Sequence, residues 1–243
     1  INRVLFPYLR EAYKLLISGV APAMIENAAK AIGMPLGPLA LMDEIALDLN
    51  YKVLKQTKAD LGSAFEDNDQ LEFMKTMVVT LNRLGKKNKK GFYDYHDDGT
   101  KTLWKDYPMT NTHNTIDISY DTIKERLLYS LCIEAVSCVC EGIITDPREA
   151  DVGLIFGIGF APFTGGPLSY VETIGIKNFI ATAKKLEKAY GKQFKVPKAV
   201  IEMAKKETTF YMPKAHKKSA MFNQEFNKKM NQQTPSTKHK KQP

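Results

Sequence analysis

The stretch from Gly33 to Asp43, GMPLGPLALMD, constrains the fold most, because it is apolar yet holds two glycines and two prolines. Pro38 suits the first turn of a helix, where the N–H that proline lacks would have no partner within the helix. Gly33 suits the end of a preceding helix, where glycine adopts positive φ at little cost. The stretch therefore predicts a buried turn between two helices, and we call residues 33–38 the first corner.

A variant of this stretch, GFAPFTGGPL, returns at residues 159–168, and we call residues 159–167 the second corner. Other landmarks recur in the same order: Glu11-Ala12 with Glu134-Ala135, Gly19 with Gly142, and Gly37-Pro38-Leu39 with Gly166-Pro167-Leu168. The members of the first two pairs are 123 positions apart, and those of the third pair are 129 positions apart. The second unit therefore has six extra residues between its second and third landmarks. A fixed order with one insertion predicts a duplicated helical unit.

The periodicity of the chain predicts an all-α fold. Residues 2–19 repeat apolar side chains every 3.6 residues, as an amphipathic helix does, and Ile123, Leu127 and Leu131 form the corresponding stripe of the second unit. We see no alternating strand pattern. The expected organisation is a first helical domain at 1–96, a linker at 97–116, a second, pseudo-repeated domain at 117–212 and a disordered Lys-rich tail at 213–243.

The first helices of the two units carry broad apolar stripes, which would associate if they were exposed. We therefore expect the two units to pack through these faces about a pseudo-twofold axis, with Leu131 in the shared core. A helix start is expected at Asp146-Pro147, with Asp146 as the N-cap. Residues 71–84 are expected to form one further helix.

The positive charge of this chain does not predict nucleic-acid binding. The formal net charge is +8, but the last 31 residues contain eight lysines and one glutamate, so the remaining chain is nearly neutral. That tail has few large apolar residues and is expected to be disordered. No apolar run reaches the roughly 18 residues that a transmembrane helix needs. We therefore expect no specific nucleic acid and no transmembrane segment. The three cysteines are expected to be buried, reduced thiols, which predicts a cytoplasmic location.

Motifs for catalysis or metal binding are not recognisable in this sequence. Gly157-Ile158-Gly159 begins like a dinucleotide fingerprint, but position 162 is proline and no βαβ unit surrounds it. The three cysteines match no zinc or redox spacing. The residues alone therefore indicate a duplicated helical module without its own catalytic set, and no metal or cofactor site.

Several motifs together resemble the C-terminal domain of L-3-hydroxyacyl-CoA dehydrogenases. They are, in chain order, NRVLFPY at 2–8, GMPLGPLALMDEIALD at 33–48 and the segment 85–95 that ends in GFYDY. The second unit fits as well, with EGIITDP at 141–147 and FTGGPL at 163–168. The double arrangement is similar to the C-terminal end of the multifunctional fatty-oxidation α-subunit. It implies two tandem domains of the 6-phosphogluconate-dehydrogenase C-terminal-like type.

The resemblance assigns a catalytic role to Asn2, whose amide would hydrogen-bond the substrate oxygen or orient a histidine. The alternative is a purely structural role, in which Asn2 caps the first helix. The resemblance also implies that Met34, Pro35 and Leu39 line one wall of the acyl-CoA pocket, although tight helix packing explains the same residues. The four lysines of segment 85–95 are consistent with a solvated loop or with contact to the acyl-CoA phosphates.

The resemblance further implies fatty-acid β-oxidation, in which NAD is held by an upstream domain and not by this chain. Because the sequence starts with Ile1 and a helix pattern, we expect it to be the C-terminal part of a longer protein. The expected partners are upstream NAD-binding and crotonase-like domains, the acyl-CoA substrate and, as a further candidate, a thiolase subunit. The chain alone should be inactive. The alternative is a non-catalytic helical dimerisation or docking module.

Overall fold

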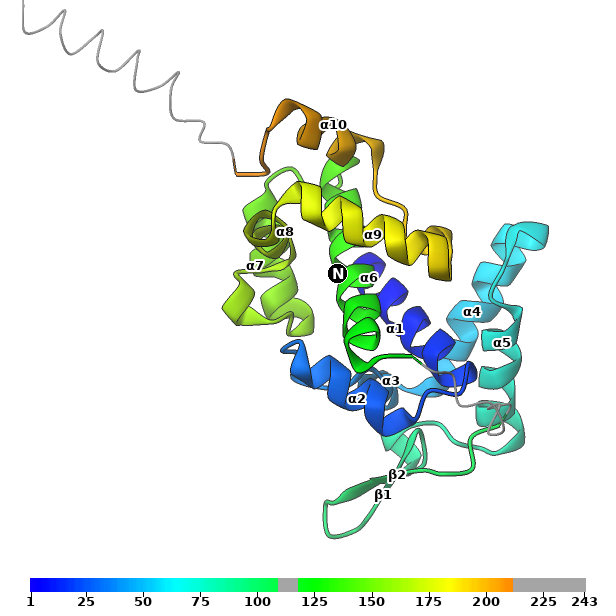
Figure 1. The fold of residues 1–243 in the computed structure, drawn as a ribbon. Helices are drawn as coiled ribbons and strands as arrows, with labels where there is room; N and C mark the ends of the chain where they lie inside the picture. The colour runs from blue at the N-terminus through cyan, green and yellow to red at the C-terminus, as the bar shows by residue number, and fades with distance from the viewer. Residues whose placement is uncertain (109–117, 212–243) are drawn as a thin grey trace, which may run out of the picture.

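The computed structural model describes residues 1–108 and 118–211. The expectations for residues 109–116 and for the tail at 213–243 therefore lie outside the described residues. The first unit contains α1 (Asn2–Ile17), α2 (Pro22–Ala31), α3 (Pro38–Ile45), α4 (Leu47–Leu61), α5 (Asn68–Lys75), β1 (Tyr93–Tyr95) and β2 (Lys101–Leu103). The second contains α6 (Tyr120–Cys140), α7 (Pro147–Ile158), α8 (Pro167–Ile174), α9 (Ile176–Tyr190) and α10 (Lys198–Lys206). The predicted all-α class is confirmed (Figure 1).

The duplication is visible in the helix bounds. Helices α3 and α8 have the same length, as do α4 and α9, and each pair is related by 129 positions. The backbone conformation of the connecting residue repeats as well: Ala46, between α3 and α4, and Gly175, between α8 and α9, both have φ of 83°. The six inserted residues do not form one block. Pro22 and Pro147, which open α2 and α7, are 125 positions apart, so two of the residues are inserted before α7 and four between the starts of α7 and α8.

Helices α1 and α6 lie side by side and form the centre of the molecule (Figure 1). Val4, Leu9 and Leu16 of α1 are buried, and so are Leu127 and Leu131 of α6. These residues belong to one continuous hydrophobic core that extends through both units. The shared core expected from the two apolar stripes, with Leu131 inside it, is therefore present.

Two salt bridges across this interface reveal a pseudo-twofold axis. The Arg3 Nε donates to Glu134 over 2.5 Å, and the Arg126 Nε donates to Glu11 over 2.6 Å. Arg3 corresponds to Arg126, and Glu11 to Glu134, by the same offset of 123 positions. An interface in which i contacts j′ and j contacts i′ is isologous, as in a symmetric dimer. The second unit thus occupies the place that a second copy would take.

The chain departs from its local pattern between residues 76 and 108. Helix α5 ends at Lys75 and a single π-turn follows at residues 76–80, so the helix expected over 71–84 is interrupted. Strands β1 and β2 form a short antiparallel hairpin. Tyr107 donates a hydrogen bond of 2.7 Å to the Phe92 carbonyl. Residues 101–107, assigned from sequence to a linker, therefore pack on the first unit.

Candidate functional site

Asn2 is the first residue of α1 and its side chain is exposed. The N-cap position belongs to Ile1, and no side chain caps this helix. The capping alternative for Asn2 is therefore wrong, because the residue lies one position inside the helix. Its neighbour Arg3 is held by Glu134 and by a two-pronged contact to Glu141 of 2.6 and 2.9 Å. This anchoring fixes the start of α1 and leaves the Asn2 amide accessible to a ligand.

The two corners pack against one another. A Cβ atom on Gly33 would lie 2.6 Å from the Ala161 Cβ, and one on Gly159 would overlap the Pro35 ring. Gly33 and Gly159 have φ of 97° and 71°, so each glycine is required both by its backbone angle and by the close approach. The Ile1 side chain lies against Gly157, two residues from the site of Pro35 contact. The start of α1 and the first corner therefore meet the same segment at the end of α7.

The four site residues expected from the resemblance differ in accessibility. Asn2 and Pro35 are exposed, and the side chains of Pro35 and of Ile1, the residue before Asn2, lie against Gly159 and Gly157. Met34 and Leu39 are buried in the core. Pro35 is thus the corner residue that can touch a ligand directly, while Met34 and Leu39 lie behind it. Whether any of them acts on a substrate stays a prediction.

A buried carboxylate caps the helix that follows each corner. Glu26 accepts hydrogen bonds from the Leu39 and Ala40 amides at 2.7 and 3.4 Å, and from the Tyr93 hydroxyl at 2.6 Å. In the second unit, Asp151 accepts from the Leu168 amide at 2.8 Å and also from the amide and hydroxyl of Ser169. Each carboxylate satisfies orphan N–H groups and faces the positive end of the helix dipole.

These carboxylates explain the Gly-Pro-Leu signature of both corners. A Cβ on Gly37 would overlap the Glu26 carboxylate, and a Cβ on Gly166 would overlap Asp151. The glycine makes room for the carboxylate, and the proline after it has no N–H that would need a partner. Sequence reasoning missed both acids. The available signal was a Gly-Pro helix start without any Ser, Thr, Asp or Asn beside it.

A third buried acid, Asp43, fixes the hairpin to α3. Its carboxylate accepts from the Phe92 and Tyr93 amides at 2.7 and 2.9 Å and from the Tyr95 hydroxyl at 3.1 Å. Burial raises the pKa of Asp43 to about 6, and the two amide hydrogen bonds only partly oppose this effect. The aspartate of the first corner motif and the aromatic GFYDY motif are thus parts of one structural unit.

We expect Asp43 to make the stability of the protein depend on pH. Because its pKa is higher in the folded than in the unfolded chain, its contribution is complete below pH 4 and is lost as the pH rises through 6. A shift from 3.8 to about 6 corresponds to a contribution on the order of 3 kcal/mol. Urea unfolding of the protein and of Asp43→Asn between pH 4 and 7 measures it. The variant should lack this decline, and parallel pH profiles would contradict the assignment.

The surface lysines of segment 85–95 are largely paired with acids of the same unit. Lys86 contacts Glu44 at 2.7 Å, Lys87 contacts Asp48 at 2.5 Å, and Lys89 pairs with Asp97. Such pairs are typical of a solvated surface. They favour the interpretation of this segment as a solvated loop over contact with the acyl-CoA phosphates.

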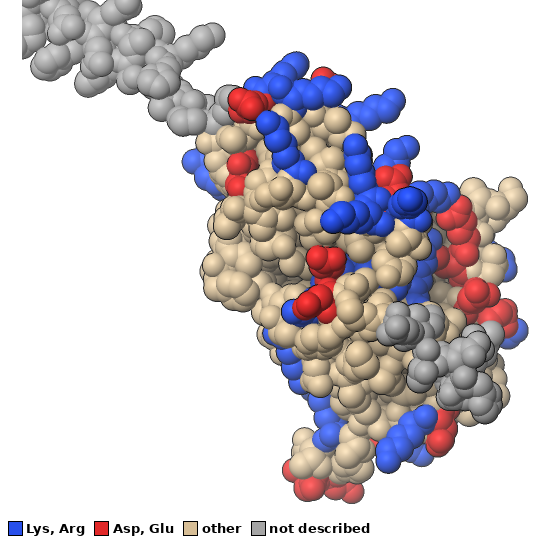
Figure 2. Space-filling view, viewed as in Figure 1, with Lys and Arg blue, Asp and Glu red and all other residues tan. Residues whose placement is uncertain are grey.

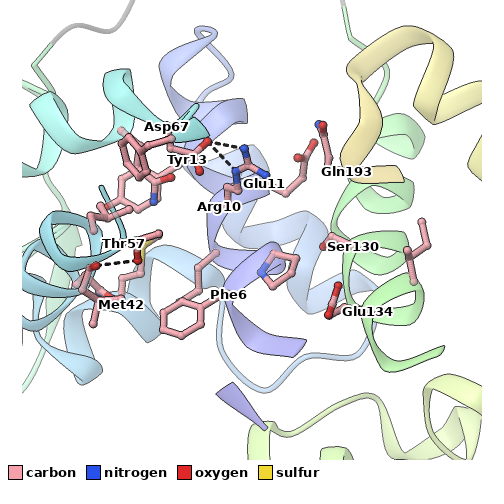
Figure 3. A pocket seen from close by; sticks show the side chains of 18 residues that line it. Phe6, Arg10, Glu11, Tyr13, Met42, Thr57, Asp67, Ser130, Glu134 and Gln193 are labelled. Carbon is pink, nitrogen blue, oxygen red and sulfur yellow. Dashed lines mark hydrogen bonds and ion pairs between the residues drawn. The ribbon is translucent and has the colours of Figure 1, made fainter. Parts of the chain in front are cut away.

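A cavity of about 390 Å³ lies between the two units (Figure 3). Its walls come from α1, α4 and α6, with Phe6 and Tyr13 on one side and Ser130 and Glu134 on another. Arg10 and Asp67 form a salt bridge of 2.6 Å at its edge. None of the four residues expected to form the substrate site lines this cavity.

An exposed apolar surface lies next to the start of α1. Phe156 is 87% exposed and Phe163 is 79% exposed, and Val152 and Ile1 are also largely uncovered. In Figure 2 the flank formed by α7 and α8 is mostly free of charged side chains, whereas Lys and Arg gather above α9 and α10. Large exposed apolar side chains on a face with few charges are a feature of surfaces that contact other molecules.

Residues 1–108 and 118–211 contain neither a candidate metal site nor a candidate membrane-spanning helix. Among them, no cluster of three His, Cys, Asp or Glu side chains could hold a metal ion. No helix in this part of the chain is long and apolar enough to cross a membrane.

Comparison with known families supports the resemblance that the sequence motifs indicated. Residues 1–95 match the family model described as 3-hydroxyacyl-CoA dehydrogenase, C-terminal domain. A protein called fatty acid oxidation complex subunit alpha from Shewanella sp. (strain MR-7) is 33% identical over 217 residues. Its namesake from Shewanella loihica is 34% identical over 213 residues. Both alignments cover 87% of this chain but only 30% of the relative, so the chain spans less than a third of their length.

Two solved structures share the fold. Escherichia coli 3-hydroxybutyryl-CoA dehydrogenase aligns with a TM-score of 0.59 and 19% identity over 85% of this chain and 59% of that one. The dehydrogenase part of multifunctional enzyme 1 from C. elegans aligns with a TM-score of 0.57 and 19% identity, over 83% and 46% of the two chains. At this identity the likeness concerns the fold. The match of residues 1–95 to the family model and the similarity to the curated relatives agree with the family that the sequence motifs resemble.

Proposed function

Because residues 1–95 carry the C-terminal domain of the 3-hydroxyacyl-CoA dehydrogenase family, we propose that this chain is the helical part of an enzyme that oxidises 3-hydroxyacyl-CoA in fatty-acid β-oxidation. The observation that carries the proposal is the family match over the segment that begins with Asn2 and contains the first corner. The similarity to fatty acid oxidation complex α-subunits over 87% of the chain extends it to the second unit.

In this proposal Asn2 donates a hydrogen bond from its amide to the oxygen on C3 of the substrate. That oxygen changes from hydroxyl to carbonyl during oxidation, and a fixed donor stabilises the charge that develops on it. The exposed position of Asn2 and the anchoring of Arg3 by Glu134 and Glu141 support this role. Pro35 would contact the acyl chain at its surface, with Met34 and Leu39 supporting it from the core.

NAD, the hydride acceptor of such a reaction, has no cradle among the described residues of this chain. A pyrophosphate site needs a glycine-rich turn at the start of a helix that follows a strand. Gly157 and Gly159 instead lie at the end of α7, with Gly159 as its left-handed C-cap. NAD binding in this proposal belongs to another part of the complete protein.

The exposed apolar flank supports a docking role for the same surface. Ile1 touches Gly157, so the uncovered Phe156 and Phe163 lie on the side where α1 begins. We infer that an NAD-binding domain packs here and closes the substrate site. Crotonase-like domains and a thiolase subunit, as further partners, and a cytoplasmic location belong to the same proposal.

Activity of a chimera would test the role of Asn2. The NAD-binding part of a Shewanella fatty acid oxidation complex subunit alpha, joined to this chain, should oxidise 3-hydroxyacyl-CoA, while this chain alone should neither bind NAD in calorimetry nor turn over. Asn2→Ala should lower kcat by about 10²–10³, as loss of an oxyanion donor does. The matched control is Asn178→Ala, an exposed asparagine on α9 whose side chain donates a hydrogen bond to the Ile174 carbonyl.

The outcomes separate the enzyme from the alternative. A chimera that folds, binds NAD and stays equally active after the Asn2→Ala substitution would remove the site role. An inactive chimera whose helical part still binds a partner chain through Phe156 and Phe163 would favour the non-catalytic docking module.

A further inference from the structure

The two units differ in charge over equivalent helices. Residues 176–206, which contain α9 and α10, carry nine lysines and two glutamates, with no arginine or aspartate, so their formal net charge is +7. The equivalent stretch of the first unit, residues 47–77 with α4 and α5, carries four lysines and six acidic residues, a net charge of −2. Because both stretches form a corresponding pair of helices, the fold does not require this positive charge. We call the exposed surface of α9 and α10 the basic face.

Most lysines of the basic face have no counter-ion in the structure. All nine are exposed, and basic side chains gather over α9 and α10 in Figure 2. Lys177, Lys192 and Lys205 form salt bridges with single glutamates. The other six form no ion pair with any residue of 1–108 and 118–211, and they are Lys184, Lys185, Lys188, Lys195, Lys198 and Lys206. The face therefore differs from segment 85–95, whose lysines are largely paired within their own unit.

The side chains of the basic face do not suit nucleic-acid recognition. Surfaces that bind single strands use exposed aromatic rings and arginine planes on which bases stack. Residues 176–206 contain no arginine, and their aromatic residues are occupied: Phe179 and Phe194 are buried, and Tyr190 packs on the Arg126 guanidinium. A lysine ammonium is instead a compact, hydrated point charge without preferred geometry. Lysines alone suit a diffuse layer of negative charge.

Helix α10 adds apolar side chains to the basic face. Ile201 and Met203 are only partly buried, although they pack against the core. Exposed lysines lie at both ends of this helix, at Lys198 and at Lys205 and Lys206. Helices that lie on a bilayer surface combine these features, because lysines reach the lipid phosphates while apolar side chains face the acyl chains. A nucleic acid would leave such apolar side chains without a partner.

We propose that the basic face binds peripherally to a bilayer that contains anionic phospholipids, with its unpaired lysines at the lipid phosphates. Surfaces that recognise such bilayers carry clusters of about four to eight basic residues, a range that includes the six unpaired lysines. The face belongs to the second unit, so it is separate from the site proposed at Asn2 and Pro35 and from the apolar flank at Phe156 and Phe163.

Sedimentation of the 243-residue chain with lipid vesicles tests the proposal. The chain should bind vesicles of phosphatidylcholine mixed with phosphatidylglycerol, and it should not bind vesicles of phosphatidylcholine alone. A triple variant with Lys184→Gln, Lys185→Gln and Lys188→Gln on α9 should bind the mixed vesicles about a hundredfold more weakly, because each lysine near an anionic bilayer contributes about fivefold. Its Tm should equal that of the unmodified chain, since these side chains are exposed and unpaired.

The equivalent helix of the first unit provides the matched control. Lys52→Gln, Lys55→Gln and Lys58→Gln on α4 remove the same charge from exposed positions, and Lys55 is the counterpart of Lys184. This variant should bind the mixed vesicles like the unmodified chain. Equal losses in both triple variants would overturn the proposal, and so would undiminished binding of the α9 variant. Binding to a DNA duplex without binding to mixed vesicles would overturn it in favour of nucleic acid. No outcome depends on NAD or CoA, so the proposed enzymatic function would be unaffected.

Discussion

Replacing Glu11 with glutamine is expected to lower the free energy of unfolding by about 3–5 kcal/mol. Glu11 is 1% exposed and its partner Arg126 is 7% exposed, so the guanidinium would remain buried without a counter-charge. The Tyr190 ring, whose centroid is 4.1 Å from the Arg126 guanidinium carbon, packs on the guanidinium but cannot neutralise its charge. Urea unfolding at pH 7 measures the loss.

The duplication provides a matched control for this experiment. Glu134→Gln removes the equivalent acid from the Arg3 pair, whose side chains are 22% and 42% exposed. Water and Glu141 continue to solvate Arg3 there, so the expected loss is about 1 kcal/mol or less. Equal losses at the two sites would show that burial does not distinguish the pairs. A Glu11→Met, Arg126→Leu double variant should recover most of the stability, because it leaves no unpaired charge.

The first unit expressed alone, as residues 1–108, is expected to self-associate instead of remaining a monomer. This fragment retains the hairpin and Tyr107, which pack on the first unit, but it exposes the α1 face that α6 covers. That face includes Leu9 and Leu16, whose exposure to water is unfavourable by about 25 cal/mol per Å². Analytical ultracentrifugation and thermal unfolding test the expectation.

The pseudo-twofold axis indicates how such a fragment would pair. Arg3 and Glu11 correspond to Arg126 and Glu134, so two copies of the first unit could form both salt bridges, Arg3 with Glu11 of the other copy in each case. Arg3→Glu should then weaken self-association of the fragment by placing like charges together. A fragment that is monomeric and as heat-stable as the whole chain would mean that the two units are independent domains.

Features that depend on neighbouring residues could be predicted from the sequence. The two corners follow from glycine and proline at fixed places in an apolar run, and α7 begins at Pro147 with the Asp146 side chain accepting from the Arg148 amide, as expected. The 3.6-residue period predicted α1 and α6 and the core between them. Local conformational preferences act over a few residues, so they leave a local trace in the sequence.

Features that join distant residues were decided by the tertiary structure. The capping of α3 by Glu26 spans 13 residues, and that of α8 by Asp151 spans 17, so no capping motif of the usual spacing reports them. The hairpin at residues 93–103 is fixed by Asp43, whose carboxylate accepts a hydrogen bond from the amide of Phe92, 49 residues later in the chain. The strands are three residues each, too short for an alternating pattern to be recognised.

The candidate site likewise has features that the sequence predicts and features that only the tertiary structure determines. The motif around Asn2 and the first corner was recognisable in the sequence, but which of its residues are exposed was not, since burial of Met34 and Leu39 depends on packing from other helices. The Arg126–Glu11 pair joins residues 115 positions apart, and the cavity between the units is lined by residues from separate helices, α1, α4 and α6. Such features arise from side chains of separate helices brought together, and helical periodicity specifies each helix without specifying its neighbour.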